Sequence, residues 1–306
     1  MEGNVKVFML MAALTALVMG LGWMMGGSGG MIMAFVIAGG MNFFAYWNSD
    51  KMVLRQQGAV ELSPSQGGEL YAMTAELARR AELPMPKLYL LPTEQPNAFA
   101  TGRNPQNAAV AVTQGLTRVL SRDEMAGVIA HELAHIKHRD TLTMTVTATM
   151  AGAIAMMGNM LLFTGGRDGR GGGIGAIVAM ILAPMAAAMV QMAISRAREY
   201  EADATGAAIC GQPRALASAL QRISAAAGRT VNVPAEKNPA AAAMFIINPL
   251  HALRADRLFA THPPTEERIA RLMALEGRAA PAARAKPTAQ SRIPRTGAPR
   301  DPRGRG

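Results

Sequence analysis

The chain has 306 residues, of which 50% are hydrophobic and only 17% charged, yet its formal net charge is +10. The basic excess is local, because residues 278–306 hold eight Lys or Arg against the single acidic residue Asp301. A lone cysteine, Cys210, excludes a disulfide framework and any metal site built from several thiolates.

The first 49 residues are predicted to form a transmembrane helical hairpin, since no charged residue occurs from 7 to 49. A bilayer core about 30 Å thick needs about 20 apolar helical residues, and the predicted spans are 7–25 and 31–47. A glycine-rich turn separates them, and the second ends in the aromatic residues typical of a membrane interface. A cleaved signal peptide is the alternative, but its apolar region would be shorter, about 7 to 15 residues.

Residues 50–140 are predicted to form the first part of a cytoplasmic α+β domain. Three short segments split by prolines predict the strands of a small sheet, namely 87–91, 97–101 and 107–113. The edge strand of a sheet can hold an extended peptide by main-chain hydrogen bonds, and Asn97 is a candidate for positioning such a substrate. A turn-capping asparagine is the structural alternative.

The motif His-Glu-x-x-His at residues 131–135 carries the strongest chemical signal. Ser121 and Glu124 have the spacing of a capping box, which predicts a helix through the motif. Residues four apart share one face of a helix, so His131 and His135 can bind one metal ion, with zinc typical of this pattern. Glu132 lies beside that face and is predicted to be the general base rather than a ligand.

A second transmembrane hairpin is predicted over residues 141–195, with spans 141–163 and 174–195. Threonines and Pro184 make these runs less apolar, so a buried core hairpin is the alternative. Lys and Arg flank both hairpins on the side of residues 50–140 and 196–306. By the positive-inside rule, this places both termini and the motif in the cytoplasm of a multi-pass protein.

Candidates for a third metal ligand follow the second hairpin, in residues 195–204. On a helix, Glu199 and Asp203 share a face, whereas Glu201 points away. That pairing suits one metal ligand and one carboxylate that accepts the free ring N–H of a ligating histidine. The hairpin would return this segment to the side of residues 131–135. Taken alone, the acidic cluster favours a solvated interfacial turn, and only the His-Glu-x-x-His motif makes it a candidate for ligands.

Residues 196–277 are predicted to form the second part of the cytoplasmic domain. A helix is expected over 213–227, and a last amphipathic helix would face the core with Ile269, Leu272 and Met273. Residues 278–306 are predicted to be a disordered basic tail, which would be attracted to an anionic lipid surface. Nucleic acid is not expected as a partner, because no folded binding motif accompanies the tail.

Four motifs, in this order, resemble the HtpX family of bacterial membrane zinc metalloproteases, related more distantly to the CAAX prenyl endopeptidases. They are residues 97–102, 131–135, 195–203 and 261–269, and the resemblance covers nearly all of residues 1–275. It implies a mainly α membrane protein with four transmembrane helices. The cytoplasmic part would be an α+β metalloprotease domain of the zincin type with a small sheet.

The resemblance also implies one zinc ion per chain, with His131, His135 and Glu199 as its ligands. Glu132 would be the catalytic base, and Asp203 would accept the free ring N–H of a ligating histidine.

Two further residues, His262 and Arg268, match positions that lie near the zinc in the prenyl endopeptidases. There they would stabilise the oxyanion of the tetrahedral intermediate. Helix capping and a surface cation are the structural alternatives.

The implied activity is endoproteolysis of misfolded or damaged membrane proteins, as quality control and stress response at the bacterial cytoplasmic membrane. Its partners would be protein or peptide substrates and the lipid bilayer. Two other functions stay open, a zinc-binding membrane scaffold without catalysis and an intramembrane protease of the site-2 type. The site-2 type places its motif inside an apolar span, whereas charged residues surround the motif here.

Overall fold

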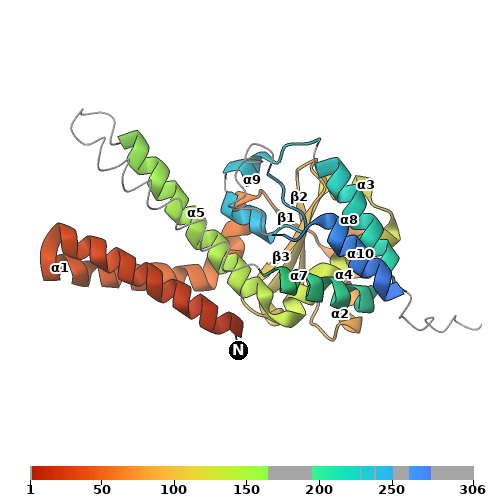
Figure 1. Ribbon diagram of the computed structural model, residues 1–306, viewed down its shortest axis with the longest axis horizontal. Coiled ribbons are helices and arrows are strands. Elements are labelled where there is room, and N and C mark those ends of the chain that lie inside the picture. The colour runs from red at the N-terminus through yellow and green to blue at the C-terminus, as the bar shows by residue number, and fades with distance from the viewer. Residues whose placement is uncertain (1, 165–194, 228, 238, 251–261, 277–306) are drawn as a thin grey trace, which may run out of the picture.

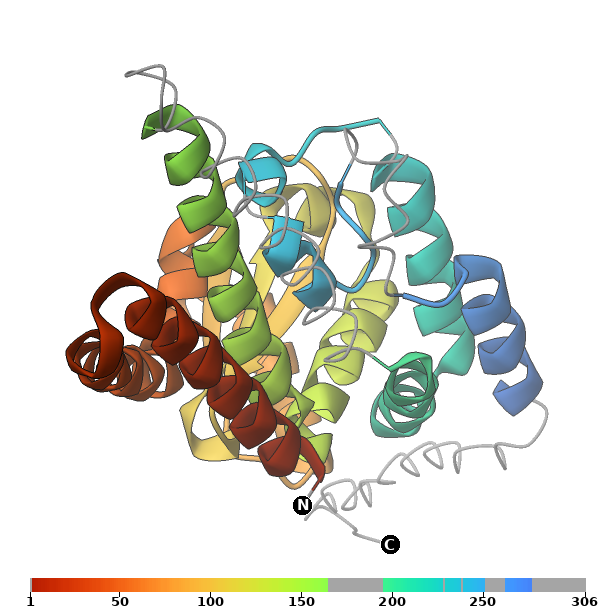
Figure 2. The same ribbon diagram turned by 60° about the vertical axis from the view of Figure 1, so that its left-hand side comes forward.

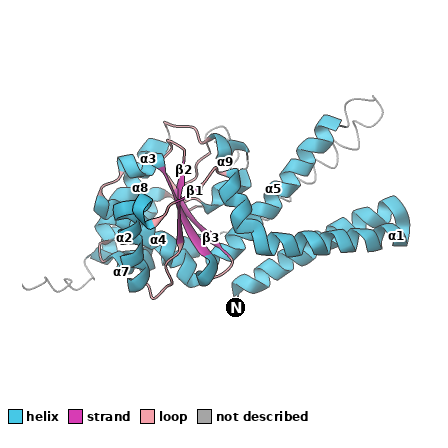
Figure 3. Ribbon diagram, turned by 180° about the vertical axis from the view of Figure 1, so that it is seen from behind, coloured by secondary structure: helices cyan, strands magenta, loops and turns pink. Residues whose placement is uncertain are grey.

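The computed structural model describes residues 2–164, 195–227, 229–237, 239–250 and 262–276. Figure 1 shows a globular part built around a small sheet, with a helical hairpin and one long helix extending from it to one side. Seen from behind in Figure 3, the sheet stands between two groups of helices. The mainly helical architecture with a small mixed sheet confirms that part of the prediction. The predicted tail, residues 278–306, lies outside the described residues.

Helix α1, Glu2–Gln56, consists of two antiparallel limbs that join at Gly26 and Gly27. Gly27 has φ 57°, a left-handed value that glycine adopts without a steric cost. Side-chain amide hydrogen bonds tie the limbs together, because Asn42 Nδ2 donates to Thr15 Oγ1 at 2.8 Å and to the Met11 carbonyl at 3.2 Å. The reversal occurs in the predicted glycine-rich turn.

Both limbs of α1 pass a test of length and composition for crossing a membrane, over Val7–Met24 and Gly26–Gln56. Their surfaces agree, since large apolar side chains such as Phe8, Trp23 and Phe35 are more than half exposed. These two limbs are the candidate spans found among the described residues.

The sheet has four strands in the order β1-β2-β4-β3, with β2 and β4 parallel and the other neighbours antiparallel. Its strands are β1 (Val60–Glu61), β2 (Lys87–Leu91), β3 (Ala98–Gly102) and β4 (Ala108–Thr113). The last three agree with the predicted segments to within one residue at each end. The two-residue β1 has no counterpart in the sequence analysis.

Both faces of the sheet are buried, because successive side chains of a strand point to opposite faces. Val110 and Val112 pack against the helices α2 (Pro64–Arg80), α4 (Arg122–His138) and α8 (Pro213–Ala227). Ala109 and Ala111 face the other layer, which contains the end of α1 and the start of α5 (Asp140–Thr164). Burial on both sides explains why β4 is apolar throughout.

Helix α4 begins with the predicted capping box. The Ser121 backbone N–H donates to Glu124 Oε2 at 2.8 Å, and the Glu124 N–H donates to Ser121 Oγ at 3.4 Å. The same carboxylate accepts a hydrogen bond from Ser218 Oγ of α8 at 2.6 Å. The short helix α3 (Gln114–Val119) precedes α4 in the chain. Helix α4 is therefore fixed at its start to both its own first turn and its neighbour.

The predicted span 141–163 forms α5, and the first part of that helix is buried in the protein. Leu142, Val146 and Met150 pack against Val7 and Leu10 of α1, and Figure 2 shows α5 rising from the globular part beside the first limb. The apolar side chains in the first part of α5 therefore contribute to packing within the protein, so their presence alone does not indicate a membrane span. Of the predicted span 174–195, all but its last residue lies outside the described residues, so the second hairpin stays a prediction.

The C-terminal helices of the described chain pack on the α4 side of the sheet. They are α7 (Arg196–Cys210), α8 and α10 (Thr265–Glu276), while the short α9 (Val233–Lys237) and the 3-10 turn Pro239–Met244 lie on the other side. Helix α8 has the predicted bounds. For α10 the predicted inner face was wrong in one residue, since Met273 is 39% exposed. Arg268 takes the inner position one turn before the buried Leu272.

We expect Glu124→Ala to lower the free energy of unfolding by about 1–2 kcal/mol, because it removes a helix cap and leaves the half-buried Ser218 hydroxyl without its acceptor. The thermal unfolding midpoint in detergent measures the effect. Asp123→Ala is the matched control, since Asp123 is an exposed acid in the same first turn. Equal midpoints for the two variants would contradict the role given to Glu124.

Candidate metal centre

Helices α4 and α7 lie side by side, and a glycine lets them approach closely (Figure 1). A Cβ atom on Gly206 of α7 would lie 2.8 Å from His131 Cα and 2.9 Å from its backbone nitrogen. Any larger residue would therefore collide with the backbone of α4. Since Glu199 and Asp203 lie on the same helix and are buried, this contact turns both carboxylates toward the motif.

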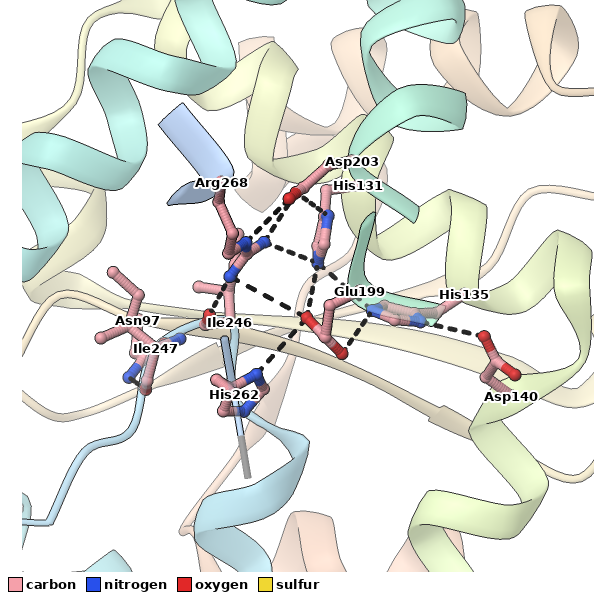
Figure 4. A network of polar contacts seen from close by, with 10 residues as sticks. All are labelled: Asn97, His131, His135, Asp140, Glu199, Asp203, Ile246, Ile247, His262 and Arg268. Carbon is pink, nitrogen blue, oxygen red and sulfur yellow. Dashed lines mark hydrogen bonds and ion pairs between the residues drawn. The ribbon is translucent and has the colours of Figure 1, made fainter. Parts of the chain in front are cut away.

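The structure brings His131, His135 and Glu199 together, with one potential ligand atom of each within 4.8 Å of the others. The two Nε2 atoms are 3.2 Å apart. Glu199 Oε2 lies 3.8 Å from His131 Nε2, and Glu199 Oε1 lies 3.6 Å from His135 Nε2. All three side chains are buried, and Figure 4 shows them converging from α4 and α7.

This group fits a metal ion in both its chemistry and its charge. Two imidazole nitrogens and one carboxylate are the donors of a catalytic zinc site, and Glu199 Oε2 has no hydrogen-bond partner among the described residues. Burial alone would lower the pKa of His135, but the carboxylates of Glu199, Asp140 and Glu132 raise it to about 9. The surroundings thus favour a positive charge between the rings.

The other histidine, His131, is neutral, and its Nδ1 contacts the carboxylate of Asp203. Burial lowers the pKa of His131 to about 4, which outweighs the opposing effect of Asp203. His131 Nδ1 lies 3.0 Å from Asp203 Oδ1. Such a contact fixes the ring with its proton on Nδ1, which leaves Nε2 free to bind a metal.

Asp203 forms a second contact, a two-pronged ion pair with Arg268 of α10. Arg268 Nη2 and Nε lie 2.7 and 2.8 Å from the two carboxylate oxygens of Asp203, and its Nη1 donates to the Ile246 carbonyl at 2.8 Å. Arg268 is 1% exposed, so it is not a surface cation. Three elements that are distant in sequence therefore meet at this guanidinium group.

His262 also reaches the cluster, with its Nδ1 3.4 Å from Glu199 Oε2. Its Nε2 has no hydrogen-bond partner in the described part of the chain. Arg268 Nη1 lies 3.9 Å from the same oxygen of Glu199. Both residues singled out in the 261–269 motif are thus placed beside the potential ligands.

Glu132 is 1% exposed and lies between the two histidines in sequence. Burial, together with the charge of Glu199, raises its pKa to about 7. Its carboxylate accepts a hydrogen bond from the Ala100 backbone N–H of β3. A carboxyl group with this pKa can both accept and release a proton near neutral pH.

Asn97 lies apart from the ligand group and is fully buried. Its Nδ2 donates to the Ile247 carbonyl at 2.7 Å, and its Oδ1 accepts from the Ile247 N–H at 3.4 Å. The Ile246 N–H donates to the Ala98 carbonyl at 3.0 Å. In the structure Asn97 therefore binds the protein's own backbone beside β3.

One contact of the cluster has no counterpart in the sequence analysis. His135 Nδ1 lies 3.3 Å from Asp140 Oδ2, and Figure 4 shows this carboxylate on the side of the ring away from His131. The signal in the sequence is an acidic residue five positions after the second histidine of the motif. Spacing on a continuous helix would not have pointed to it.

Comparison with known proteins agrees with the motif. The sequence model described as Peptidase family M48 matches residues 64–276, more than half of the chain. Among solved structures, the crystal structure of S. mikatae Ste24p is similar, with a TM-score of 0.45 and 19% sequence identity. That match covers 88% of this chain and 65% of Ste24p, so the chain spans less than two thirds of that protein's length.

We expect Gly206→Ala to weaken metal binding and to lower the unfolding midpoint, although Gly to Ala within a helix ordinarily stabilises by about 1 kcal/mol. The added methyl group would push α7 away from the His131 backbone and carry Glu199 with it. Zinc content after dialysis, measured by atomic absorption, and thermal unfolding report the two effects. Gly39→Ala is the control, because nothing lies within 4 Å of a Cβ at that position. Matching behaviour of the two variants would refute the close-approach argument.

Proposed function

The chain belongs to peptidase family M48, and from this premise we propose that it is a membrane-bound, zinc-dependent endopeptidase. The observation that carries the proposal is the convergence of His131, His135 and Glu199 in the protein interior, with Glu132 next to them. One zinc ion per chain would be held by the first three residues. The reaction is hydrolysis of a peptide bond without a covalent intermediate.

A zinc ion held by His131, His135 and Glu199 would supply Lewis acidity, which would polarise the scissile carbonyl and make the attacking water more acidic. Glu132 takes the proton of that water and passes it to the leaving amine, a role for which its pKa of about 7 is suited. Asp203 holds His131 in the tautomer with Nε2 unprotonated. Arg268 in turn holds Asp203 by its two short contacts.

Of the two residues implied as oxyanion donors, we favour His262. Its Nε2 is without a hydrogen-bond partner among the described residues, whereas Arg268 is already engaged by Asp203 and the Ile246 carbonyl. A protonated His262 nitrogen can donate to an oxygen that gains charge in the transition state. Arg268 acts as a positioning residue in this scheme, because it reaches the ligands through Asp203.

As substrates we propose misfolded or damaged membrane proteins, cleaved on the cytoplasmic side of the bacterial inner membrane. Two features support this class. The apolar, exposed limbs of α1 suit a bilayer, and the edge of β3 suits main-chain recognition, which tolerates many sequences. The flanking Lys and Arg residues support a cytoplasmic site by the positive-inside rule. Quality control and stress response are the physiological roles that such specificity would serve.

A scaffold that binds zinc without catalysis is the second candidate function. Against it stands the buried Glu132, since a structural zinc site needs no unligated carboxyl group with a pKa of about 7 beside it. The site-2 type of intramembrane protease is disfavoured because the potential ligands belong to α4 and α7, while the apolar limbs of α1 contribute none.

We expect Glu132→Gln to abolish zinc-dependent cleavage of casein, or of the chain itself, while zinc content stays near one per chain. The substitution removes the proton acceptor and leaves the three ligands. Glu199→Gln is the comparison variant and should instead lose zinc affinity. Purified full-length protein in detergent, stripped of metal and then given zinc, provides the assay.

Retained cleavage by Glu132→Gln would overturn the mechanism. Zinc binding without cleavage by the parent protein, for casein and for unfolded membrane proteins alike, would favour the scaffold. Unchanged zinc affinity in Glu199→Gln would move the third ligand to another residue.

A further inference from the structure

Asp140, the first residue of α5, contacts the potential metal ligand His135. We propose that Asp140 is a positioning residue for the metal ligand His135: it accepts the Nδ1–H of that ring and so directs Nε2 to the metal. The inference deepens the proposed function and rests on it. It assigns to His135 a carboxylate of its own, as Asp203 serves His131.

The turn between α4 and α5 brings Asp140 to the ring. Five residues further along a continuous α-helix, a side chain lies about 140° around the axis and cannot return to the same face. Here α4 ends at His138, and Arg139 adopts φ 61° and ψ 31°, a left-handed conformation. A non-glycine residue pays about 1–2 kcal/mol for that conformation. The break lets Asp140 Oδ2 approach to 3.3 Å from His135 Nδ1.

The two histidines are then held in parallel ways. Each Nδ1 faces a carboxylate, at 3.0 Å for His131 with Asp203 and 3.3 Å for His135 with Asp140. Each Nε2 faces Glu199. A carboxylate behind a ligating histidine selects the tautomer, fixes the ring plane and makes the free nitrogen a stronger donor. Figure 4 shows the two carboxylates on opposite sides of the pair of rings.

Asp140 also forms an ion pair with Arg198 of α7. Arg198 Nε lies 3.3 Å from Asp140 Oδ1, and the two side chains are 22% and 10% exposed. Arg198 directly precedes the potential ligand Glu199. The ion pair therefore connects the start of α5 to the helix that carries Glu199, while the other oxygen of the same carboxylate holds His135. One buried carboxylate thus links both halves of the ligand set.

A purely structural role for Asp140 makes a different prediction. An acidic residue at the start of a helix stabilises that helix through its free N–H groups and dipole. Its loss would lower stability with or without metal and leave the metal affinity of the folded protein unchanged. Metal affinity and the spectrum of a bound metal therefore separate positioning from helix capping.

The test uses the full-length chain in detergent, with Glu132→Gln present throughout to prevent self-cleavage. Asp140→Ala, Asp140→Asn and Asp140→Glu are stripped of metal and titrated with zinc against a chromophoric chelator, and with cobalt for its visible absorption. We expect about 10–100-fold weaker zinc binding for the Ala and Asn variants, with a changed cobalt spectrum, and a smaller loss for Glu. Asp123→Asn, which removes an exposed carboxylate from α4, should bind as the parent does.

Zinc affinities within about twofold of the parent for folded Asp140→Asn would overturn the inference, even if its unfolding midpoint falls. If Asp140→Ala does not fold, Asp140→Asn and Arg198→Gln decide the outcome. Arg198→Gln keeps the carboxylate but removes its charge partner, so a smaller loss of affinity supports the inference and parental affinity opposes it. A parent protein that binds no zinc would defeat the proposed function, whereas a parent that binds beside unaffected Asp140 variants defeats this inference alone.

Discussion

Burial of many ionisable groups in one place is the constraint on which this structure depends. Eight such side chains meet between α4, α7, the start of α5 and the start of α10, and all are buried or nearly so: His131, Glu132, His135, Asp140, Glu199, Asp203, His262 and Arg268. An unpaired charge in a protein interior costs several kcal/mol. Each carboxylate must therefore be near a cation, and the surrounding helices are arranged to meet that need.

Arg268 and Arg198 each balance one carboxylate of this cluster. Arg268 faces Asp203, and Arg198 faces Asp140. Among the described residues, the arginine paired with Glu199 is Arg268, at 3.9 Å, and Glu199 lies between the two histidines. The remaining negative charge is thus concentrated where the ring nitrogens converge, which is where a cation would be bound. The metal centre follows from this charge balance as much as from the histidines themselves.

The sequence predicted local features well wherever one residue type has one physical role. Ser121 and Glu124 predicted the start of α4, and the prolines around residues 87–113 predicted three strands to within a residue. Apolar periodicity was less decisive. It did not separate a span from a buried helix, because the first part of α5 packs in the protein. It also placed Met273 on the inner face of α10, where Met273 is exposed; the buried residue one turn before Leu272 is Arg268, which pairs with Asp203.

Contacts that depend on an unusual backbone could not be predicted. Asp140 reaches His135 only because Arg139 is left-handed, a conformation that nothing about an arginine indicates. The sequence also contains no pattern that predicts the two-residue strand β1.

The edge of β3 has a consequence for substrate binding, because Ala98 and Ala100 already have hydrogen-bond partners there, in Ile246 and Glu132. A peptide pairing with β3 must displace an internal competitor, whose effective concentration is on the order of millimolar. A soluble substrate such as casein would need a comparable concentration, whereas a chain anchored in the same membrane reaches it at a lower bulk concentration.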